Sequence, residues 1–181
     1  MRVIAGAARR TALSAPKGLN TRPTSDRIKE NLFNILAPDV PGARFLDLFC
    51  GSGAIGIEAL SRGADMAVFV DSSREAIAVT GDNLARARLG DKARVLNMCA
   101  LKAVSQLQAE GYVFDIVYLD PPYGAEVLTQ ALTTLCGILA EGAIVVAEVA
   151  KDESISSPLA ILFEREYGNT RLQFYTKEQS S

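Results

Sequence analysis

Histidine is absent from this 181-residue sequence, and its absence excludes several kinds of catalytic site. No histidine can serve as a general base, bind a metal or complete a Ser-His-Asp triad. The three cysteines, Cys50, Cys99 and Cys136, are widely spaced and form no C-x-x-C pair. An odd number of cysteines at this spacing favours neither a disulfide framework nor a zinc site. We therefore expect no metal, and we interpret the cysteines as small buried hydrophobic residues.

Long apolar runs are also missing. None approaches the ~20 residues that a membrane-spanning helix needs. The apolar stretch within residues 1–6 is too short for a signal peptide, so we expect a cytoplasmic protein without membrane association. With 181 residues, 49% of them hydrophobic, the chain is long enough for one α/β domain with a full core, and we expect a monomer.

The charged residues are unevenly distributed, although the net charge is only −2. Residues 1–44 hold eight basic and three acidic side chains, whereas the remainder holds 11 basic and 18 acidic ones. A basic segment on an acidic body indicates a polyanionic partner that binds at one end. The alternative is a solvated face on which the charges cluster by chance.

Short apolar runs alternate with helical patterns from residue 44 onward, which is typical of a parallel sheet with crossover helices. The pattern predicts strands at 44–48, 66–70, 93–97, 114–119 and 143–148, and helices at 53–62, 74–88, 102–110 and 126–139. Two further runs, 159–167 and 170–175, flank a Gly168-Asn169 turn and predict a hairpin. A dinucleotide-binding fold would continue with another crossover. This ending instead matches the Rossmann-like, seven-stranded α/β sheet of class I methyltransferases, which has helices on both faces and an antiparallel last strand.

The N-terminal part has a different pattern. We interpret residues 1–43 as a basic extension and residues 44–181 as the methyltransferase domain. Within the extension we predict a small hairpin of residues 3–4 with residues 11–13, followed by a helix that Thr24 or Ser25 caps and that ends near Leu36.

The most informative motif is Asp120-Pro121-Pro122-Tyr123, which follows the predicted strand 114–119. Proline lacks a backbone N–H and restricts the residue before it to extended geometry. Carbonyl groups here have no adjacent donors, an ionised Asp120 only accepts hydrogen bonds, and Tyr123 offers a face for stacking. These four residues therefore indicate a catalytic pocket that holds a flat base by its exocyclic amino group. The alternative is a Pro-Pro loop terminator with a capping aspartate.

A glycine-rich loop joins the first predicted strand to the first predicted helix. Gly51, Gly53 and Gly56 also satisfy the G-x-G-x-x-G pattern of nicotinamide enzymes, because in both chemistries the backbone approaches a ligand at a helix N-terminus. Asp47 distinguishes a nicotinamide cofactor from S-adenosylmethionine. A carboxylate at this position would repel a pyrophosphate, but it suits the ammonium and sulfonium groups of S-adenosylmethionine. We assign cofactor contacts in this loop to Asp47, Phe49, Gly51, Ser52 and Gly53.

Three further positions follow predicted strands and extend the cofactor site. Asp71 can accept the ribose hydroxyls, with Ser72 beside it, a role that is shared with nicotinamide proteins. Cys99 and Ala100 lie where the adenine would bind, and we expect their backbone groups to recognise the adenine. Asp120 is expected to border the cofactor as well as the acceptor base.

Several stretches together resemble the RsmD-like family, whose members methylate guanine N2 in small-subunit ribosomal RNA. They are MRVIAG at residues 1–6, RPTSDRIKENLF at 22–33, LDLFCGSG at 46–53, EALSRG at 58–63 and the DPPY motif. The resemblance covers essentially the whole chain and implies S-adenosylmethionine as cofactor. It also implies small-subunit ribosomal RNA, or the assembling small subunit, as partner.

The basic extension would then contact RNA phosphates through Arg9, Arg10, Lys17, Arg22 and Arg27, although Arg22 and Arg27 could equally be structural. Methylation of a small molecule or of protein glutamine is disfavoured, because the basic extension would then have no role, and two rival functions stay open. One is a DNA adenine-N6 or cytosine-N4 amino-methyltransferase, which usually needs a target-recognition insert that we do not find between Tyr123 and Ala143. The other is an RNA-binding module without enzymatic activity.

Overall fold

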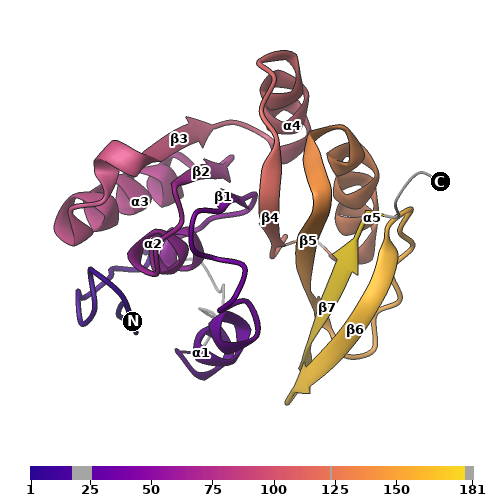
Figure 1. Ribbon diagram of the computed structural model, residues 1–181, viewed down its shortest axis with the longest axis horizontal. Coiled ribbons are helices and arrows are strands. Elements are labelled where there is room, and N and C mark those ends of the chain that lie inside the picture. The colour runs from indigo at the N-terminus through magenta and orange to yellow at the C-terminus, as the bar shows by residue number, and fades with distance from the viewer. Residues whose placement is uncertain (18–25, 123, 178–181) are drawn as a thin grey trace.

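The computed structural model describes residues 1–17, 26–122 and 124–177, and it contains one seven-stranded sheet with strand order β3-β2-β1-β4-β5-β7-β6 (Figure 1). The strands are β1 (Arg44–Asp47), β2 (Met66–Asp71), β3 (Ala93–Asn97), β4 (Phe114–Leu119), β5 (Leu139–Ala150), β6 (Ala160–Tyr167) and β7 (Thr170–Thr176). Strands β1 to β5 pair in parallel, whereas β7 is antiparallel to both of its neighbours, β5 and β6. The predicted sheet with an inserted antiparallel last strand is therefore confirmed.

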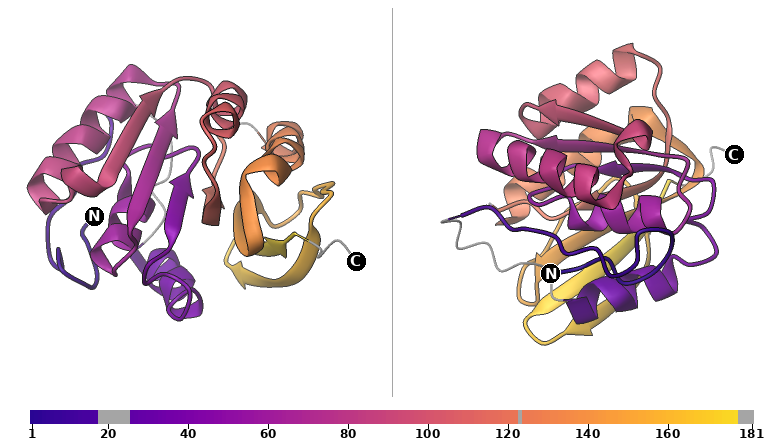
Figure 2. Two further views of the ribbon diagram at one scale, coloured as in Figure 1. Left: turned by 45° about the horizontal axis from the view of Figure 1, so that its top comes forward. Right: turned by 90° about the vertical axis from the view of Figure 1, so that its left-hand side faces the viewer.

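The helices cover both faces of this sheet, as predicted (Figure 2). They are α1 (Asp26–Ile35), α2 (Ala54–Ser61), α3 (Arg74–Ala87), α4 (Ala100–Ala109) and α5 (Gly124–Leu135), with short 3₁₀ turns η1 (Gly90–Lys92) and η2 (Cys136–Ile138). Neighbouring residues of β1 point to opposite faces. Phe45 packs in a cluster with residues of α1, α2 and α3, whereas Leu46 packs in a second cluster with residues of α4 and α5. Burial on both faces explains why the strands are continuous apolar runs.

The boundaries differ from the prediction mainly at β5, which begins at Leu139 rather than at Ala143. Glu141 and Gly142 interrupt the apolar run, so the sequence pattern hides the first part of this strand. The ladder to β4 shifts register here, and Gly142 takes a left-handed φ of +72°. A glycine tolerates this conformation without the steric penalty that other residues have, so the strand continues through the irregularity.

Residues 1–17, which we call the arm, form the predicted hairpin through a bridge between Arg2 and Ala12. The arm is bonded to the end of α2, where Ala7 N–H donates to the Ser61 carbonyl oxygen at 2.8 Å and the N–H of buried Ala8 donates to Ser61 Oγ at 2.9 Å. At Gly6, with φ +85°, an added Cβ would lie 1.7 Å from the Ser61 carbonyl oxygen. Only glycine fits this contact. Thr24 and Ser25, the predicted helix caps, lie outside the described residues.

Glu58 of α2 ties the arm to the body of the protein. Its fully buried carboxylate accepts hydrogen bonds from the backbone N–H of Ile4 at 2.8 Å and of Ala5 at 3.0 Å. It also accepts one from Arg62 Nε at 2.8 Å, and Lys29 Nζ of α1 lies 3.6 Å away. The arm, α1 and α2 therefore share one compensated buried charge. Removing either partner of such a pair leaves the other charge buried and uncompensated.

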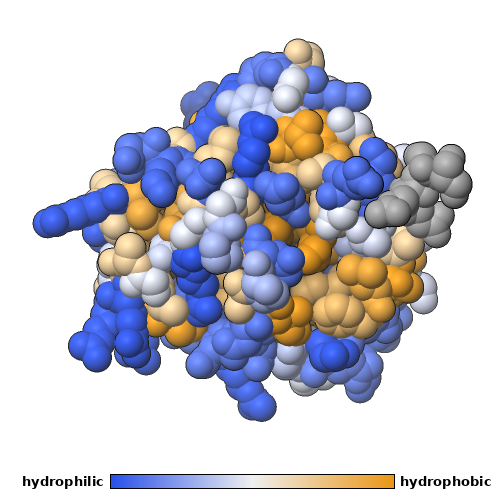
Figure 3. Space-filling model, in the orientation of Figure 1, coloured by the Kyte–Doolittle hydropathy of each residue, from blue (hydrophilic) through white to orange (hydrophobic). Residues whose placement is uncertain are grey.

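The outer surface near β6 is more apolar than the surface over the arm (Figure 3). Ile161 and Leu162 of this edge strand are 52% and 49% exposed. The ladder between β6 and β7 has a register shift at this point, and charged residues follow at 164–166. Both features discourage pairing with another strand. Within the described residues, no helix is long and apolar enough to cross a membrane.

Candidate active site

The candidate site lies at the carboxyl edge of the parallel strands, where β1 and β4 are neighbours in the sheet. The helix that follows β1 and the helix that follows β4 cover opposite faces, so this is the topological switch point at which α/β sheets bind ligands. Asp47 ends β1, Asp71 ends β2, and Asp120 follows β4. The fold thus brings the three predicted carboxylates to one edge of the sheet.

The glycine loop after β1 curls over the end of β2. Cys50 N–H donates to the Val70 carbonyl oxygen at 2.9 Å, and Gly51 N–H donates to Asp71 Oδ2 at 2.9 Å. Gly51 has a left-handed φ of +54°, and a Cβ added there would meet no protein atom within 4 Å. At Gly53, by contrast, an added Cβ would lie 2.9 Å from the Thr80 methyl group. Gly51 therefore presents open backbone on the side where a ligand would approach.

Two polar residues of α3 donate hydrogen bonds to backbone carbonyl groups of this loop, and neither was predicted from the sequence. Thr80 Oγ1 donates to the Gly51 carbonyl oxygen at 3.0 Å, and Asn83 Nδ2 donates to the Ser52 carbonyl oxygen at 2.9 Å. Both side chains are fully buried. Their spacing of three residues on the inner face of a predicted helix was the available signal, because buried polar side chains need partners.

Asp47 is buried, with only 1% of its surface exposed, and its Oδ2 accepts the Gly56 N–H at 3.0 Å. Burial raises the pKa of Asp47 to about 7; the hydrogen bond from Gly56 opposes this rise, and the negative charge of Asp71 adds to it. Asp71 is half-buried and uses both carboxylate oxygens, since its Oδ1 accepts the Ser73 N–H at 2.9 Å. Each oxygen has a second lone pair that can accept from a ligand.

The other predicted cofactor residues lie at the same edge. Phe49, Gly51 and Ser52 are half-buried in the loop, and Ser72 is exposed next to Asp71. Met98 N–H and Asn97 Nδ2 both donate to the Asp71 carbonyl oxygen, which fixes the end of β3 beside the end of β2. Cys99 is the exposed residue that precedes α4, and Ala100 begins that helix. Contrary to our expectation, only Cys50 of the three cysteines is buried.

A cavity of about 350 Å³ adjoins Asp120. Its walls come from the ends of β4 and β5, the turn between β6 and β7, and α1; they include Ile28, Asp120, Pro121, Glu148, Tyr167 and Asn169. Burial, followed by the charges of Glu148 and Asp47, raises the pKa of Asp120 to about 8. Pro121 is half-buried and Pro122 is exposed, whereas Tyr123 lies outside the described residues. No described residue of the glycine loop lines this cavity.

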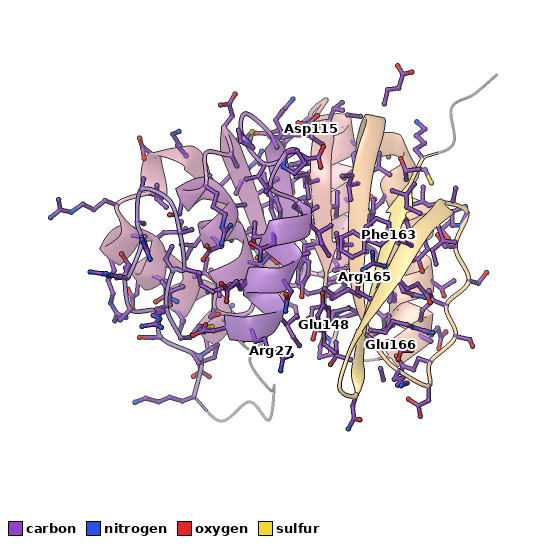
Figure 4. The ribbon with its side chains drawn as sticks, turned by 60° about the horizontal axis from the view of Figure 1, so that its bottom comes forward. Arg27, Asp115, Glu148, Phe163, Arg165 and Glu166 are labelled. Atoms are coloured by element: carbon purple, nitrogen blue, oxygen red, sulfur yellow. The ribbon has the colours of Figure 1, made fainter. Side chains whose placement is uncertain are left out.

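Glu148 of β5 is the functional candidate that the sequence analysis missed. It lines the cavity with Asp120, and its Oε2 accepts a hydrogen bond from the hydroxyl of buried Tyr118. Figure 4 shows Glu148 near the end of β5, between α1 and the β6–β7 hairpin. A single charged residue within the apolar stretch 143–150, close to the carboxyl edge, was the signal that could have found it.

The predicted RNA-contact residues are distributed over two elements. Arg9 and Arg10 are exposed in the turn of the arm hairpin, where Arg10 has a left-handed φ of +73°. Lys17 is also exposed, and its backbone N–H donates to a Glu75 carboxylate oxygen at 2.6 Å. Arg27 is exposed on α1, the helix that contributes Ile28 to the cavity wall. Arg22 lies outside the described residues.

The strand order and the helices on both faces define the fold of a class I methyltransferase, and the glycine loop lies at its switch point. The profile of the family described as conserved hypothetical protein 95 matches residues 1–176. The chain therefore belongs to that family, the RsmD-like family.

Named relatives agree with this assignment. YlbH of Bacillus subtilis, provisionally named an rRNA methyltransferase, is 38% identical over 98% of this chain and 99% of the relative. Ribosomal RNA small subunit methyltransferase D of Escherichia coli K12 is 39% identical over 82% of this chain and 74% of the relative. The solved structure of yhhF from Escherichia coli, provisionally named a methyltransferase, covers 99% of both chains with a TM-score of 0.86 and 35% identity.

Proposed function

We propose that this protein transfers a methyl group from S-adenosylmethionine to the exocyclic N2 amino group of a guanine in small-subunit ribosomal RNA. The observation that carries the proposal is the half-buried Asp120, which borders a cavity large enough for a base and lies at the edge that also holds the glycine loop. Relatives named for methylation of small-subunit ribosomal RNA support the substrate class.

The residues present fit S-adenosylmethionine by charge. Asp47, Asp71 and Asp120 lie close enough for the charge of Asp47 to raise the pKa of Asp120 and for that of Asp71 to raise the pKa of Asp47. A ligand that carries ammonium and sulfonium charges relieves this mutual repulsion, whereas a pyrophosphate would increase it. Asp47, Phe49, Gly51, Ser52 and Gly53 would hold the methionine end, Asp71 and Ser72 the ribose, and Cys99 and Ala100 the adenine.

When bound, S-adenosylmethionine supplies a methyl group that its sulfonium has already activated. The task of the protein is then to align the acceptor nitrogen with that methyl group. Asp120 and the Pro121 carbonyl oxygen would accept the two hydrogens of the amino group, and Pro122 would keep the backbone extended. Asp120 would take the proton that the nitrogen loses, and a pKa of about 8 makes it a stronger base than an ordinary aspartate.

RNA must present the guanine outside its helical stack, and flipped bases commonly stack on aromatic side chains. We assign this contact to Tyr123. The basic residues Arg9, Arg10, Lys17, Arg22 and Arg27 would hold the RNA through its phosphates, so that residues 1–43 act as the RNA-contacting extension of the methyltransferase domain 44–181. This binding should weaken steeply as salt is raised.

The test uses radiolabelled S-adenosylmethionine with the wild type and Asp120→Ala. The substrates are undermethylated small ribosomal subunits, naked ribosomal RNA and duplex DNA. We expect label in RNA or subunits with the wild type and little label with Asp120→Ala, while calorimetry shows that the variant still binds the cofactor. Label in adenine or cytosine of duplex DNA would instead assign the protein to the DNA amino-methyltransferases. Absence of label together with absence of cofactor binding would favour an RNA-binding module.

A further inference from the structure

Two carboxylates stand next to each other on the wall of the cavity, and the proposed reaction uses only one. Leu119 of β4 pairs with Ala147 of β5, so the residues one step further along, Asp120 and Glu148, are neighbours across the sheet. Neighbouring strands lie about 4.8 Å apart, and directly paired residues point to the same face. Both residues line the cavity, and the charge of Glu148 contributes to the raised pKa of Asp120.

A hydrogen bond from a buried tyrosine orients the side chain of Glu148. The hydroxyl of Tyr118, whose side chain is only 2% exposed, donates a hydrogen bond to Glu148 Oε2. Tyr118 lies on β4, two residues before Asp120, which follows the strand, so the alternation of side chains directs both to the same face. This bond orients the Glu148 carboxylate, which lines the cavity and is a hydrogen-bond acceptor when ionised.

A pair of adjacent acceptors is complementary to guanine and not to adenine. The Watson–Crick edge of guanine presents two neighbouring donors, N1–H and the N2 amino group, whereas adenine presents an amino group beside N1, which is an acceptor. An enzyme that flips a base reads it through this edge. Asp120 alone would accept the amino group of either base, and a second carboxylate opposite N1 would repel adenine.

We infer that Glu148 is the specificity-determining residue of this site, and that it selects guanine by accepting the N1–H while Asp120 holds the N2 amino group. This inference rests on the proposed function and names the group that distinguishes its substrate base. Guanine supplies donors to both carboxylates and so relieves their mutual repulsion. Adenine would place its N1 acceptor opposite the Glu148 carboxylate, and an acceptor opposite an acceptor gives strong rejection.

The test replaces the target guanine, once its position has been mapped, by 2-aminopurine in RNA assembled from ligated fragments. This base keeps the amino group at C2, but its N1 is an acceptor. We expect the wild type to prefer guanine over 2-aminopurine by roughly 10- to 100-fold in kcat/KM, because the N1 acceptor of 2-aminopurine would face the Glu148 carboxylate instead of donating to it. In Glu148→Gln the new amide can donate to N1 of 2-aminopurine and still accept from Tyr118. The preference should therefore fall to about one, or reverse.

Glu166→Gln is the matched control, because Glu166 is half-exposed on β6, forms an ion pair with Lys151 at 2.8 Å and does not line the cavity. It should keep the wild-type preference. A wild type that methylates both bases equally well would overturn the inference without recourse to any variant. So would a folded, cofactor-binding Glu148→Gln with an unchanged preference. In both cases the proposed function would stand, whereas a wild type that never labels guanine N2 would overturn both.

Discussion

The buried charge of Asp47 leads to a prediction about stability. Burial, opposed by the Gly56 hydrogen bond and increased by the charge of Asp71, raises its pKa from 3.8 to about 7. A carboxyl group whose pKa is higher in the folded than in the unfolded chain stabilises the fold while it is protonated. That contribution is complete below the unfolded pKa and is lost as the pH rises through the folded pKa. Ionised Asp47 therefore destabilises the free protein most strongly above pH 7.

Asp47→Asn removes this charge and keeps an oxygen that can accept the Gly56 N–H. A shift of about 3 pKa units corresponds to an upper limit of about 4 kcal/mol in the free energy of unfolding. Relaxation and water penetration reduce such penalties, so we expect the variant to be more stable than the wild type by about 2 kcal/mol at pH 8. For a chain of this size that is a rise in Tm of roughly 4–8 °C.

Thermal unfolding of both proteins without cofactor, near pH 4 and at pH 8, measures the effect. The two melting temperatures should be similar near pH 4 and should separate at pH 8. In addition, the variant should lose more affinity for S-adenosylmethionine than for S-adenosylhomocysteine, whose sulfur carries no positive charge. A variant that is less stable than the wild type at both pH values by the same amount would refute this account of Asp47.

Further predictions concern Asp120, Cys99 and the arm. Because Asp120 must be ionised to act, methyl transfer should rise with pH and then level off, at or below the cofactor-free pKa of about 8, because the positive charge of the cofactor lowers that pKa. Glu148→Gln should move this rise to lower pH, and a flat profile in a single-turnover assay would contradict both expectations. The exposed Cys99 should react with a thiol reagent more slowly when S-adenosylmethionine is bound, with Cys99→Ser identifying its signal, and an unchanged rate would place the adenine elsewhere. Gly6→Ala should destabilise the protein, because its Cβ would collide with the Ser61 carbonyl oxygen, and an unchanged Tm would show that the arm is not held as described.

The sheet was predictable because the sequence patterns that identify each strand, helix and turn lie within short stretches of the chain. Continuous apolar strands, helical patterns and the Gly168-Asn169 turn each lie within a short stretch of sequence, and together they fixed the strand count and the antiparallel ending. The start of β5 was not predictable, because Glu141 and Gly142 interrupt its apolar run where the ladder to β4 shifts register.

The carboxylates at the strand ends were predictable for a similar reason, since parallel strands of one sheet present their carboxyl ends at the same edge. The cavity beside Asp120 was not, because its walls combine α1, the end of β5 and the β6–β7 turn, which are far apart in the sequence. Glu148 becomes a candidate only when β5 is known to lie beside β4. Likewise, nothing local shows that buried Glu58 accepts hydrogen bonds from the backbone of the arm.

The most direct test of the central claim is the identity of the methylated nucleoside. Undermethylated small subunits would be incubated with the wild-type protein and labelled S-adenosylmethionine, and the RNA would be digested and analysed by mass spectrometry. The account predicts N2-methylguanosine, because it proposes that Asp120 holds the exocyclic amino group next to the methyl donor. Label in 1-methylguanosine or in a methylated adenosine would contradict it, since a different nitrogen would then face the methyl group.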